Sequence, residues 1–297
     1  MRLRYDVVDV FTDRPFAGNQ LAVVHGADDL SADQCLALTQ EFNFSETTFP
    51  ASGSGPAEYA TRIFTPAGEI PFAGHPTLGT AWVLRSLGRF TTDEVTQLCG
   101  AGRIGVRFED ESVELTAVPR DRLGPVDAPT VSGLLGDLDL ADDDLAGEVW
   151  VAGCGLSFVH LPVVADAIGR ARPTGRPFTE RREQLATLGH AQDPIEGINL
   201  VHVSGAPPQL TVRARVFVPG LAVPEDPATG SAAAGLGIAL VATGQLPEGG
   251  SYEITQGVEL GRPSQLQGRV EVSDGSVRAC RVAGQVHHIA TGEIAVP

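Results

Sequence analysis

The stretch RIFTPAGEIPFAGHPTLGTAWVL (residues 62–84) recurs in altered form as RVFVPGLAVPEDPATGSAAAGLGIAL (residues 215–240). Arg62 and Arg215 are 153 positions apart (215 − 62), and the same spacing separates Pro71 from Pro224. Each copy begins with an apolar run typical of a strand, passes through a turn that contains glycine, and enters a helix of apolar and small residues. Chance similarity of two strand–turn–helix units is the alternative. We interpret the pattern as a duplication, which predicts two lobes of similar fold.

A proline-rich segment separates the two copies. The stretch PRDRLGPVDAPT (residues 119–130) holds three prolines and no apolar cluster, as expected of a linker. We therefore expect an N-terminal lobe at residues 1–118, a linker at 119–128 and a C-terminal lobe at 129–283. A C-terminal strand at 284–297 is expected to complete the first lobe. The length of 297 residues, about twice that of a typical domain, agrees with two lobes.

Local patterns predict the other elements of the chain. Ser31 has the position of an N-cap, because the apolar residues that follow it suit one face of a helix. A second helix is expected to start at Pro76 and to end near Gly88. Short apolar and valine-rich runs predict strands at residues 5–11, 21–24, 44–49 and 60–64, and two alternating runs predict a hairpin at residues 99–118.

The charged residues exclude several classes of function. The chain has 21 basic and 37 acidic residues, for a net charge of −16, and none of the basic residues is lysine. Without lysine there is no side-chain amine for a Schiff base with pyridoxal phosphate or a carbonyl substrate, and no P-loop. The acidic balance argues against a nucleic-acid partner and against an anionic membrane surface.

The N-terminal residues and the cysteines indicate where the protein acts. The start, MRLRYDVVDVF, lacks the apolar core of a signal peptide, and no run of apolar residues is long enough to span a membrane. Four cysteines are widely scattered, with no CxxC pair. We therefore expect unpaired thiols in a reducing compartment and a cytoplasmic protein.

Both repeated turns lead into a helix N-terminus. The first backbone N–H groups of a helix lack partners within the helix, and its dipole is positive there. Such an end binds a carboxylate or phosphate without lysine. If the lobes face each other, two such ends would point into one cleft. The sequence therefore predicts a small anionic substrate.

Polar side chains at the two turns are candidates for chemistry. His75 lies at the first helix start, and Asp226 and Ser231 flank the second. Each has a structural alternative. His75 could be a structural histidine, Asp226 and Thr229 could cap the second helix, and Ser231 could be a small helix residue. Their placement at two turns related by the repeat favours a functional role.

Glu46 is a further candidate because of its neighbours. It lies between Phe44 and Phe49 in NFSETTF (residues 43–49), a run that is otherwise typical of a buried segment. A carboxyl group in apolar surroundings has a raised pKa, which suits a general acid/base near neutral pH. The alternative is an exposed corner at which Glu46 is simply solvated.

Four runs together resemble the PhzF-like family of phenazine-biosynthesis isomerases. They are GNQLAVV (18–24), NFSETTF (43–49), RIFTPAGEIPFAGHPTLGTA (62–81) and VFVPGLAVPEDPATGSAAAG (216–235). The resemblance implies an α+β fold like that of diaminopimelate epimerase, with two pseudo-symmetric lobes. Each lobe would be a mixed β-sheet wrapped around a central α-helix, with the active site between the lobes. It also implies a homodimer that uses no metal and no organic cofactor.

The resemblance also assigns roles to single residues. A glutamate shuttles a proton within the substrate in this family, and the matching residue here is Glu46. His75 and Asp226 would assist as catalytic residues. The residues implied for substrate binding are Gly74, Gly230 and Ser231. The prototype substrate is a dihydro-hydroxyanthranilate, a small molecule that carries a carboxylate.

Two other functions remain open at this point. One is a non-catalytic relative that binds a small anion, which would have no need of a buried acid/base. The other is an amino-acid epimerase. Epimerases of the related fold use two cysteines, one at each turn, and Ala73 and about Ala228 occupy those positions here. The missing thiols favour a shuttle by one carboxylate.

Overall fold

A computed structural model describes residues 1–120, 122–174, 195–218 and 224–297. The chain forms two compact units. Unit 1 comprises Met1–Thr116 and Ala283–Pro297, and unit 2 comprises Ala117–Val282. Within the described ranges, no helix combines the length and the apolar character needed to cross a membrane.

Unit 1 contains a closed barrel of eight strands. The strand order is β1-β2-β3-β4-β6-β7-β8-β16, and β1 also pairs with β16, which closes the sheet. The short β5 pairs with β4. The bounds are β1 Arg2–Val10, β2 Asn19–Val24, β3 Glu46–Ser52, β4 Glu58–Thr65, β5 Gly68–Ile70, β6 Glu94–Cys99, β7 Gly102–Glu109, β8 Ser112–Ala117 and β16 Ser276–Ala295.

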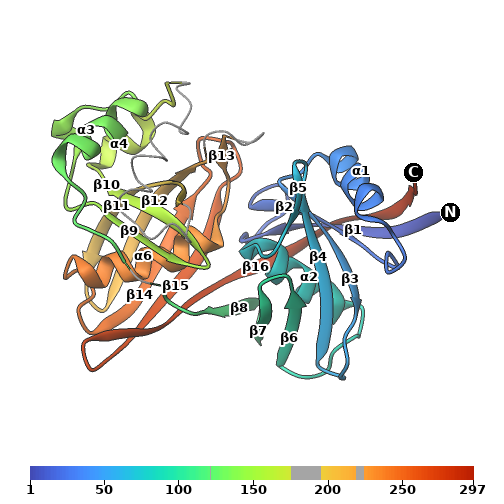
Figure 1. Ribbon diagram of the computed structural model, residues 1–297. Coiled ribbons are helices and arrows are strands. Elements are labelled where there is room, and N and C mark those ends of the chain that lie inside the picture. Colours follow the sequence, from blue (N-terminus) through green and yellow to red (C-terminus); the bar gives the residue numbers. More distant parts are fainter. Residues whose placement is uncertain (121, 175–194, 219–223) are drawn as a thin grey trace. The chain divides into compact units, whose positions relative to one another are not determined.

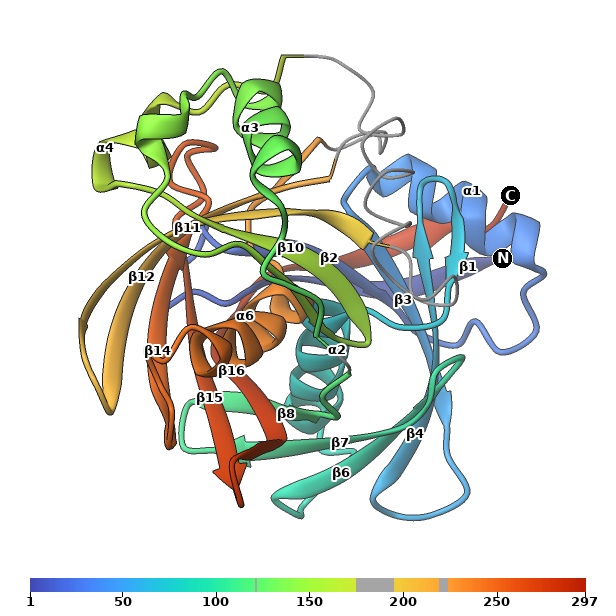
Figure 2. The same ribbon diagram turned by 60° about the vertical axis from the view of Figure 1, so that its left-hand side comes forward.

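Helix α2 (Gly74–Ser86) runs through the barrel of unit 1 (Figures 1 and 2). It contacts β1, β2, β3, β6 and β7, and most of its residues are buried. Gly79 allows this close approach, because a Cβ atom there would lie 2.6 Å from Cδ2 of Leu21. Helix α1 (Ala32–Phe42) packs outside the barrel against β3, β4 and β5. The barrel thus fixes the first turn of α2 relative to β2 and β3.

Unit 2 is also a mixed sheet with a buried helix. Its strand order is β9-β10-β11-β12-β14-β15-β16, and β13 pairs with β12. Helix α6 contacts β9, β10, β14 and β15, while α4 packs against β11 and β12. The bounds are β9 Trp150–Cys154, β10 Leu156–Pro162, β11 Ile195–Ala206, β12 Gln209–Phe217, β13 Glu225–Asp226, β14 Gly249–Gln256, β15 Ser264–Ser273, α3 Ala128–Asp137, α4 Ala165–Arg170 and α6 Gly230–Ala242, with a 3-10 turn at Asp142–Asp144.

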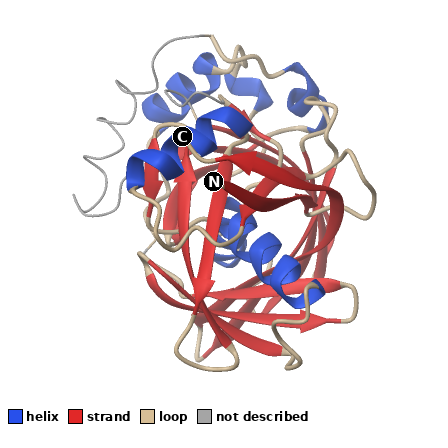
Figure 3. Ribbon diagram, turned by 90° about the vertical axis from the view of Figure 1, so that its right-hand side faces the viewer, coloured by secondary structure: helices blue, strands red, loops and turns tan. Residues whose placement is uncertain are grey.

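The two units have parallel strand pairs at corresponding places. In unit 1, β2–β3 and β4–β6 are the parallel pairs. In unit 2, β10–β11 and β12–β14 are parallel. The mixed, sheet-rich character predicted from the sequence is therefore confirmed (Figure 3). Pro219, part of the repeated motif, lies outside the described residues.

Some local predictions can be compared directly with the structure. Ser31 is the N-cap of α1, and it forms a capping box with Gln34, as its position predicted. Helix α2 begins two residues earlier than predicted, at Gly74 instead of Pro76. Arg120, Leu123 and Val126 of the expected linker donate to backbone carbonyls of residues 149–153, at and next to β9 in unit 2. There Leu123 pairs with Val151, and the segment leads into α3.

An arginine–glutamate ion pair occurs at the same place in both copies of the repeat. In unit 1, Nε and Nη2 of Arg62 on β4 donate to the two carboxylate oxygens of Glu69 on β5, at 2.9 and 2.7 Å. In unit 2, the same two atoms of Arg215 on β12 donate to Glu225 on β13, both at 2.8 Å. Each pair ties a short strand to its neighbour just before the helix begins. Such two-point pairs fix orientation as well as distance.

The two ion pairs differ in their exposure to solvent. The side chain of Arg215 is 5% exposed, and its Nη1 also donates to the backbone carbonyls of Ile168 and Ala171 in the α4 region. The side chain of Arg62 is 37% exposed. Loss of one partner from a buried pair leaves an unpaired charge in a poorly solvated place, whereas an exposed arginine is resolvated by water.

We expect Glu225→Gln to destabilise the protein far more than Glu69→Gln does. The first change should cost about 3 kcal/mol, at the low end for a broken buried pair. Glu259, 4.0 Å from Arg215, still supplies a carboxylate there. The second should cost at most about 1 kcal/mol, as for exposed pairs. Unfolding in guanidinium chloride measures both. Equal losses would contradict the difference in burial as the cause.

Candidate active site

Glu46 lies at the start of β3 and contacts helix α2. Its Oε2 is 3.5 Å from Nε2 of His75, and the Glu46 side chain is only 16% exposed. The parallel pairing of β2 with β3 sets Glu46 opposite Leu21, the residue that packs closely against α2. The alternative of a solvated corner at Glu46 is therefore wrong. The carboxylate lies against the first turn of the buried helix.

His75 is a buried and uncharged residue at neutral pH. It is the second residue of α2 and is 4% exposed. Burial lowers its pKa to about 3, and a backbone hydrogen bond with Gln20 opposes this effect only in part. Because a neutral ring carries no charge, its contact with Glu46 is not an ion pair. The ring can only exchange hydrogen bonds with its neighbours.

Asn19 connects this pair to the loop before β3. The hydroxyl of Ser45 donates to Oδ1 of Asn19 at 3.1 Å, and Nδ2 of Asn19 lies 3.3 Å from Nδ1 of His75. Asn19 is 2% exposed and is the first residue of β2. The sequence analysis did not single out this residue. The sequence feature that could have pointed to Asn19 is its position directly after Gly18. The chain turns into β2 there, and Gly18 has a φ of +68°.

Helices α2 and α6 begin without side-chain caps. Their N-cap residues, Ala73 and Thr229, make no capping hydrogen bond. By contrast, Ser31 caps α1, and Asp127 caps α3 by accepting from the amide of Thr130. The first N–H groups of the two central helices thus lack the N-cap side-chain acceptor that α1 and α3 have. An anion is the acceptor that the helix dipole favours.

Asp226 and Ser231 flank the start of α6, as the sequence predicted. Asp226 ends β13, and its Oδ2 accepts a hydrogen bond from the hydroxyl of Thr229 at 2.6 Å. Ser231 is the second residue of α6 and is 7% exposed. The Thr229 side chain does not cap the helix, because it makes no capping hydrogen bond and its hydroxyl donates to Asp226 instead.

The predicted residues fall into two groups. Glu46, His75 and Gly74 lie together in unit 1, and Asp226, Gly230 and Ser231 lie together in unit 2. Of the two positions that the sequence comparison with the thiol epimerases pointed to, Ala73 is the N-cap of α2, and Ala228 precedes Thr229, the N-cap of α6. The four cysteines lie elsewhere, in α1, β6, β9 and β16.

Known proteins resemble the chain over almost its whole length. The model of the family described as phenazine biosynthesis-like protein (PhzC-PhzF) matches residues 8–292. A trans-2,3-dihydro-3-hydroxyanthranilate isomerase of Pseudomonas chlororaphis is 35% identical, over 94% of this chain and 95% of the relative. An enzyme of the same name from Pseudomonas aeruginosa is 33% identical, over 97% of this chain and 98% of the relative.

Solved structures agree with this assignment. A protein described as a predicted epimerase from Pseudomonas aeruginosa is 31% identical and superposes with a TM-score of 0.82, over 99% of this chain and 100% of the other. A PhzF-family phenazine biosynthesis protein of Bacillus anthracis shares the fold, with a TM-score of 0.86 at 21% identity and complete coverage of both chains. The chain therefore belongs to the phenazine biosynthesis-like family and is an isomerase.

Proposed function

We propose that this isomerase moves a proton within a small carboxylate-bearing substrate of the dihydro-hydroxyanthranilate type, with Glu46 as the single acid/base and no cofactor. The observation that carries the proposal is the contact between Glu46 and the neutral ring of His75 at the uncapped start of α2. The relatives named as isomerases of trans-2,3-dihydro-3-hydroxyanthranilate support this class of substrate.

The proposed reaction needs one group that both takes and returns a proton. The Glu46 carboxylate removes a proton from a ring carbon, and the electrons of that C–H bond move into the conjugated system. The protonated carboxyl group then gives the same proton to another carbon on the same face of the ring. A new C–H bond forms there, the double bonds shift, and the carboxylate is restored. Nothing is oxidised or reduced.

His75 is proposed to stabilise the charge that develops on the substrate. This role places the ring proton on Nε2, the nitrogen nearest Glu46, with Nδ1 accepting from the Asn19 amide; in the other tautomer Nδ1 donates to the Gln20 backbone and Nε2 carries no proton. A neutral N–H donor stabilises a developing oxyanion or enolate and does not compete with Glu46 for the migrating proton. A ring with a pKa near 3 stays neutral through the reaction.

The uncapped helix starts are proposed to bind the substrate. The amide of Gly74 in unit 1 and those of Gly230 and Ser231 in unit 2 are N–H groups of the kind that bind a carboxylate. Asp226 would accept a hydrogen bond from an amino or hydroxyl substituent. The proposal also includes a duplicated origin of the two units. It further includes a homodimer, whose mass analytical ultracentrifugation would measure.

Epimerisation is a second candidate, favoured by the likeness to the predicted epimerase of Pseudomonas aeruginosa. Inversion of a carbon needs one group to remove a proton from one face and another to add one to the opposite face. The thiols that do this in related epimerases are absent from both helix starts. We therefore keep the shuttle by one carboxylate as the proposed reaction.

Glu46→Gln should lower kcat on trans-2,3-dihydro-3-hydroxyanthranilate by about 10²- to 10⁴-fold or more, because the amide cannot take up a proton. Its size is almost the same, so folding and ligand binding should persist. The change in ultraviolet absorbance measures turnover, and calorimetry measures binding.

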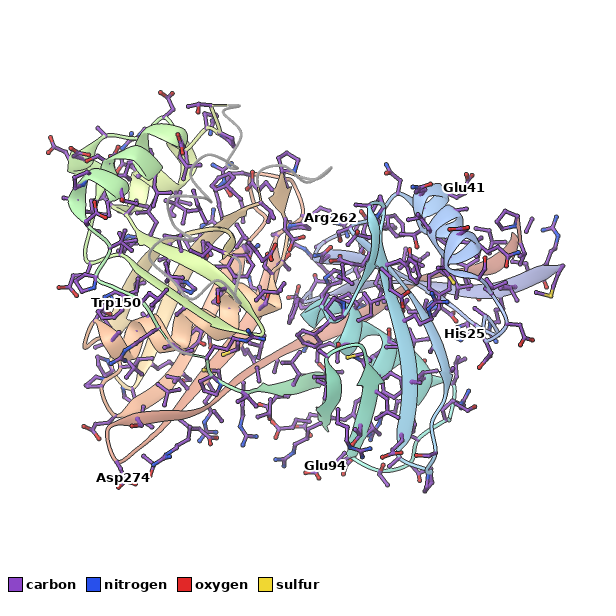
Figure 4. All side chains as sticks on the ribbon, in the orientation of Figure 1. His25, Glu41, Glu94, Trp150, Arg262 and Asp274 are labelled. Atoms are coloured by element: carbon purple, nitrogen blue, oxygen red, sulfur yellow. The ribbon has the colours of Figure 1, made fainter. Side chains whose placement is uncertain are left out.

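Glu41→Gln is the matched control, since Glu41 is an exposed residue of α1 (Figure 4). It should leave turnover unchanged. A substrate deuterated at the reacting carbon should also give a product that keeps part of the label when the reaction runs in ordinary water. Near-normal turnover by Glu46→Gln would reject the shuttle.

The neutral state of His75 predicts a dependence of stability on pH. Burial lowers the pKa of His75 to about 3, below the ordinary value of 6.5. The unfolded chain therefore gains a proton below about pH 6.5 that the folded chain does not gain. This contribution to stability is complete above pH 6.5 and is lost as pH falls towards 3.

The free energy of unfolding should thus fall less steeply between pH 6 and pH 4.5 in His75→Asn than in the natural protein. The difference in slope should approach about 1.4 kcal/mol per pH unit. Urea unfolding at several pH values measures it. Parallel slopes in the two proteins would mean that His75 is protonated in the fold.

A further inference from the structure

One buried glutamine organises the loop that carries the unit 2 residues of the proposed site. Gln256 is the last residue of β14 and is 2% exposed. Its Nε2 donates to the backbone carbonyl of Asp226 at 2.8 Å and to the hydroxyl of Thr229 at 3.2 Å. Its Oε1 accepts from the amide of Thr229 at 3.3 Å. A single side chain thus bonds to both ends of residues 226–229.

These bonds form a directed chain. Because Gln256 donates to the oxygen of Thr229, the hydrogen of that hydroxyl is free to point towards Asp226. Thr229 indeed donates to Oδ2 of Asp226 at 2.6 Å. The amide of Gln256 therefore determines which way the Thr229 hydroxyl points, and that hydroxyl orients the Asp226 carboxylate.

The same contacts explain why Thr229 does not cap α6. Its hydroxyl is engaged with Asp226 and Gln256, so it is not available to the first amides of the helix. The backbone also packs tightly here. At Gly257, which follows Gln256, a Cβ atom would lie only 2.6 Å from the carbonyl oxygen of Pro227. The end of β14 therefore packs closely against the loop.

We propose that Gln256 is a positioning residue of the reaction, acting through Thr229 to orient Asp226 and to keep the α6 start open for the substrate. The proposal rests on the proposed function, because it assumes that Asp226 and the first residues of α6 hold the substrate. Gln256 itself touches neither substrate nor the reacting atoms.

The decisive variant is Gln256→Glu, which keeps the acceptor for the Thr229 amide and removes both donors. The Thr229 hydroxyl should then turn towards the new carboxylate and away from Asp226. We expect kcat/KM on trans-2,3-dihydro-3-hydroxyanthranilate to fall at least about tenfold, since small misplacements of orienting groups have effects of this size. Gln267→Glu, an exposed glutamine of β15, is the matched control and should stay within about twofold.

Thr229 variants test the route and remain informative if Gln256→Glu fails to fold. Thr229→Val should lower kcat/KM about as much as Gln256→Glu does. Thr229→Ser keeps the hydroxyl, so its kcat/KM should stay close to that of the natural protein. In the double variant Gln256→Glu/Thr229→Val the two losses should not multiply, because both changes break one chain of bonds. Normal activity of Thr229→Val or losses that multiply would overturn the proposal.

Amide hydrogen exchange separates this proposal from the proposed function. Exchange at residues 226–233 should be at least about tenfold faster in Gln256→Glu than in Gln267→Glu. If the natural protein does not turn over the compound, the proposed function fails, and exchange still shows whether Gln256 orders this loop. Unchanged exchange would overturn the positioning role even in an active enzyme.

Discussion

The buried two-point ion pair Arg215–Glu225 is the interaction on which the α6 start depends, and Arg62–Glu69 is its more exposed counterpart before α2. Arg62–Glu69 and Arg215–Glu225 each join a long strand to the short strand beside it. In unit 2 the residue after Glu225 is Asp226, so the buried ion pair fixes the position of the backbone from which the Asp226 side chain extends. Arginine suits the role because its planar fork matches a carboxylate at two points and it stays charged when buried. Gln256 then fixes the same loop from the other side, from β14.

A contrast between helix ends separates supporting elements from candidate binding elements. Helices α1 and α3 have caps that the local sequence provides, and each cap accepts from one amide of the first turn. Helices α2 and α6 are buried in their sheets yet have no side-chain cap. Buried backbone amides need acceptors. An anion is an acceptor that the helix dipole favours at such a start.

Sequence reasoning succeeded where the signal is local. The Ser31 cap follows from four neighbouring residues, and the repeat of the strand–turn–helix unit follows from direct comparison of two segments. The contact of Glu46 with His75 could not be derived from spacing, because it depends on how β2 and β3 pair around α2. Asn19 and Gln256 were missed for the same reason: their partners are 56 and 27 to 30 positions away, and long-range bonds leave no periodic pattern.

The correspondence between the units itself argues for one base instead of two. Glu46 lies three residues before the partner of Arg62 on β3, and Gly197 lies three residues before the partner of Arg215 on β11. At Gly197 a Cβ atom would lie 2.2 Å from the carbonyl oxygen of Phe217, so no carboxylate side chain fits there without a backbone shift. On the helices, His75 and Ser231 are both second residues. The second copy thus has a hydroxyl in place of the imidazole and a glycine at the position that corresponds to Glu46, a difference that agrees with the proposal of a single base.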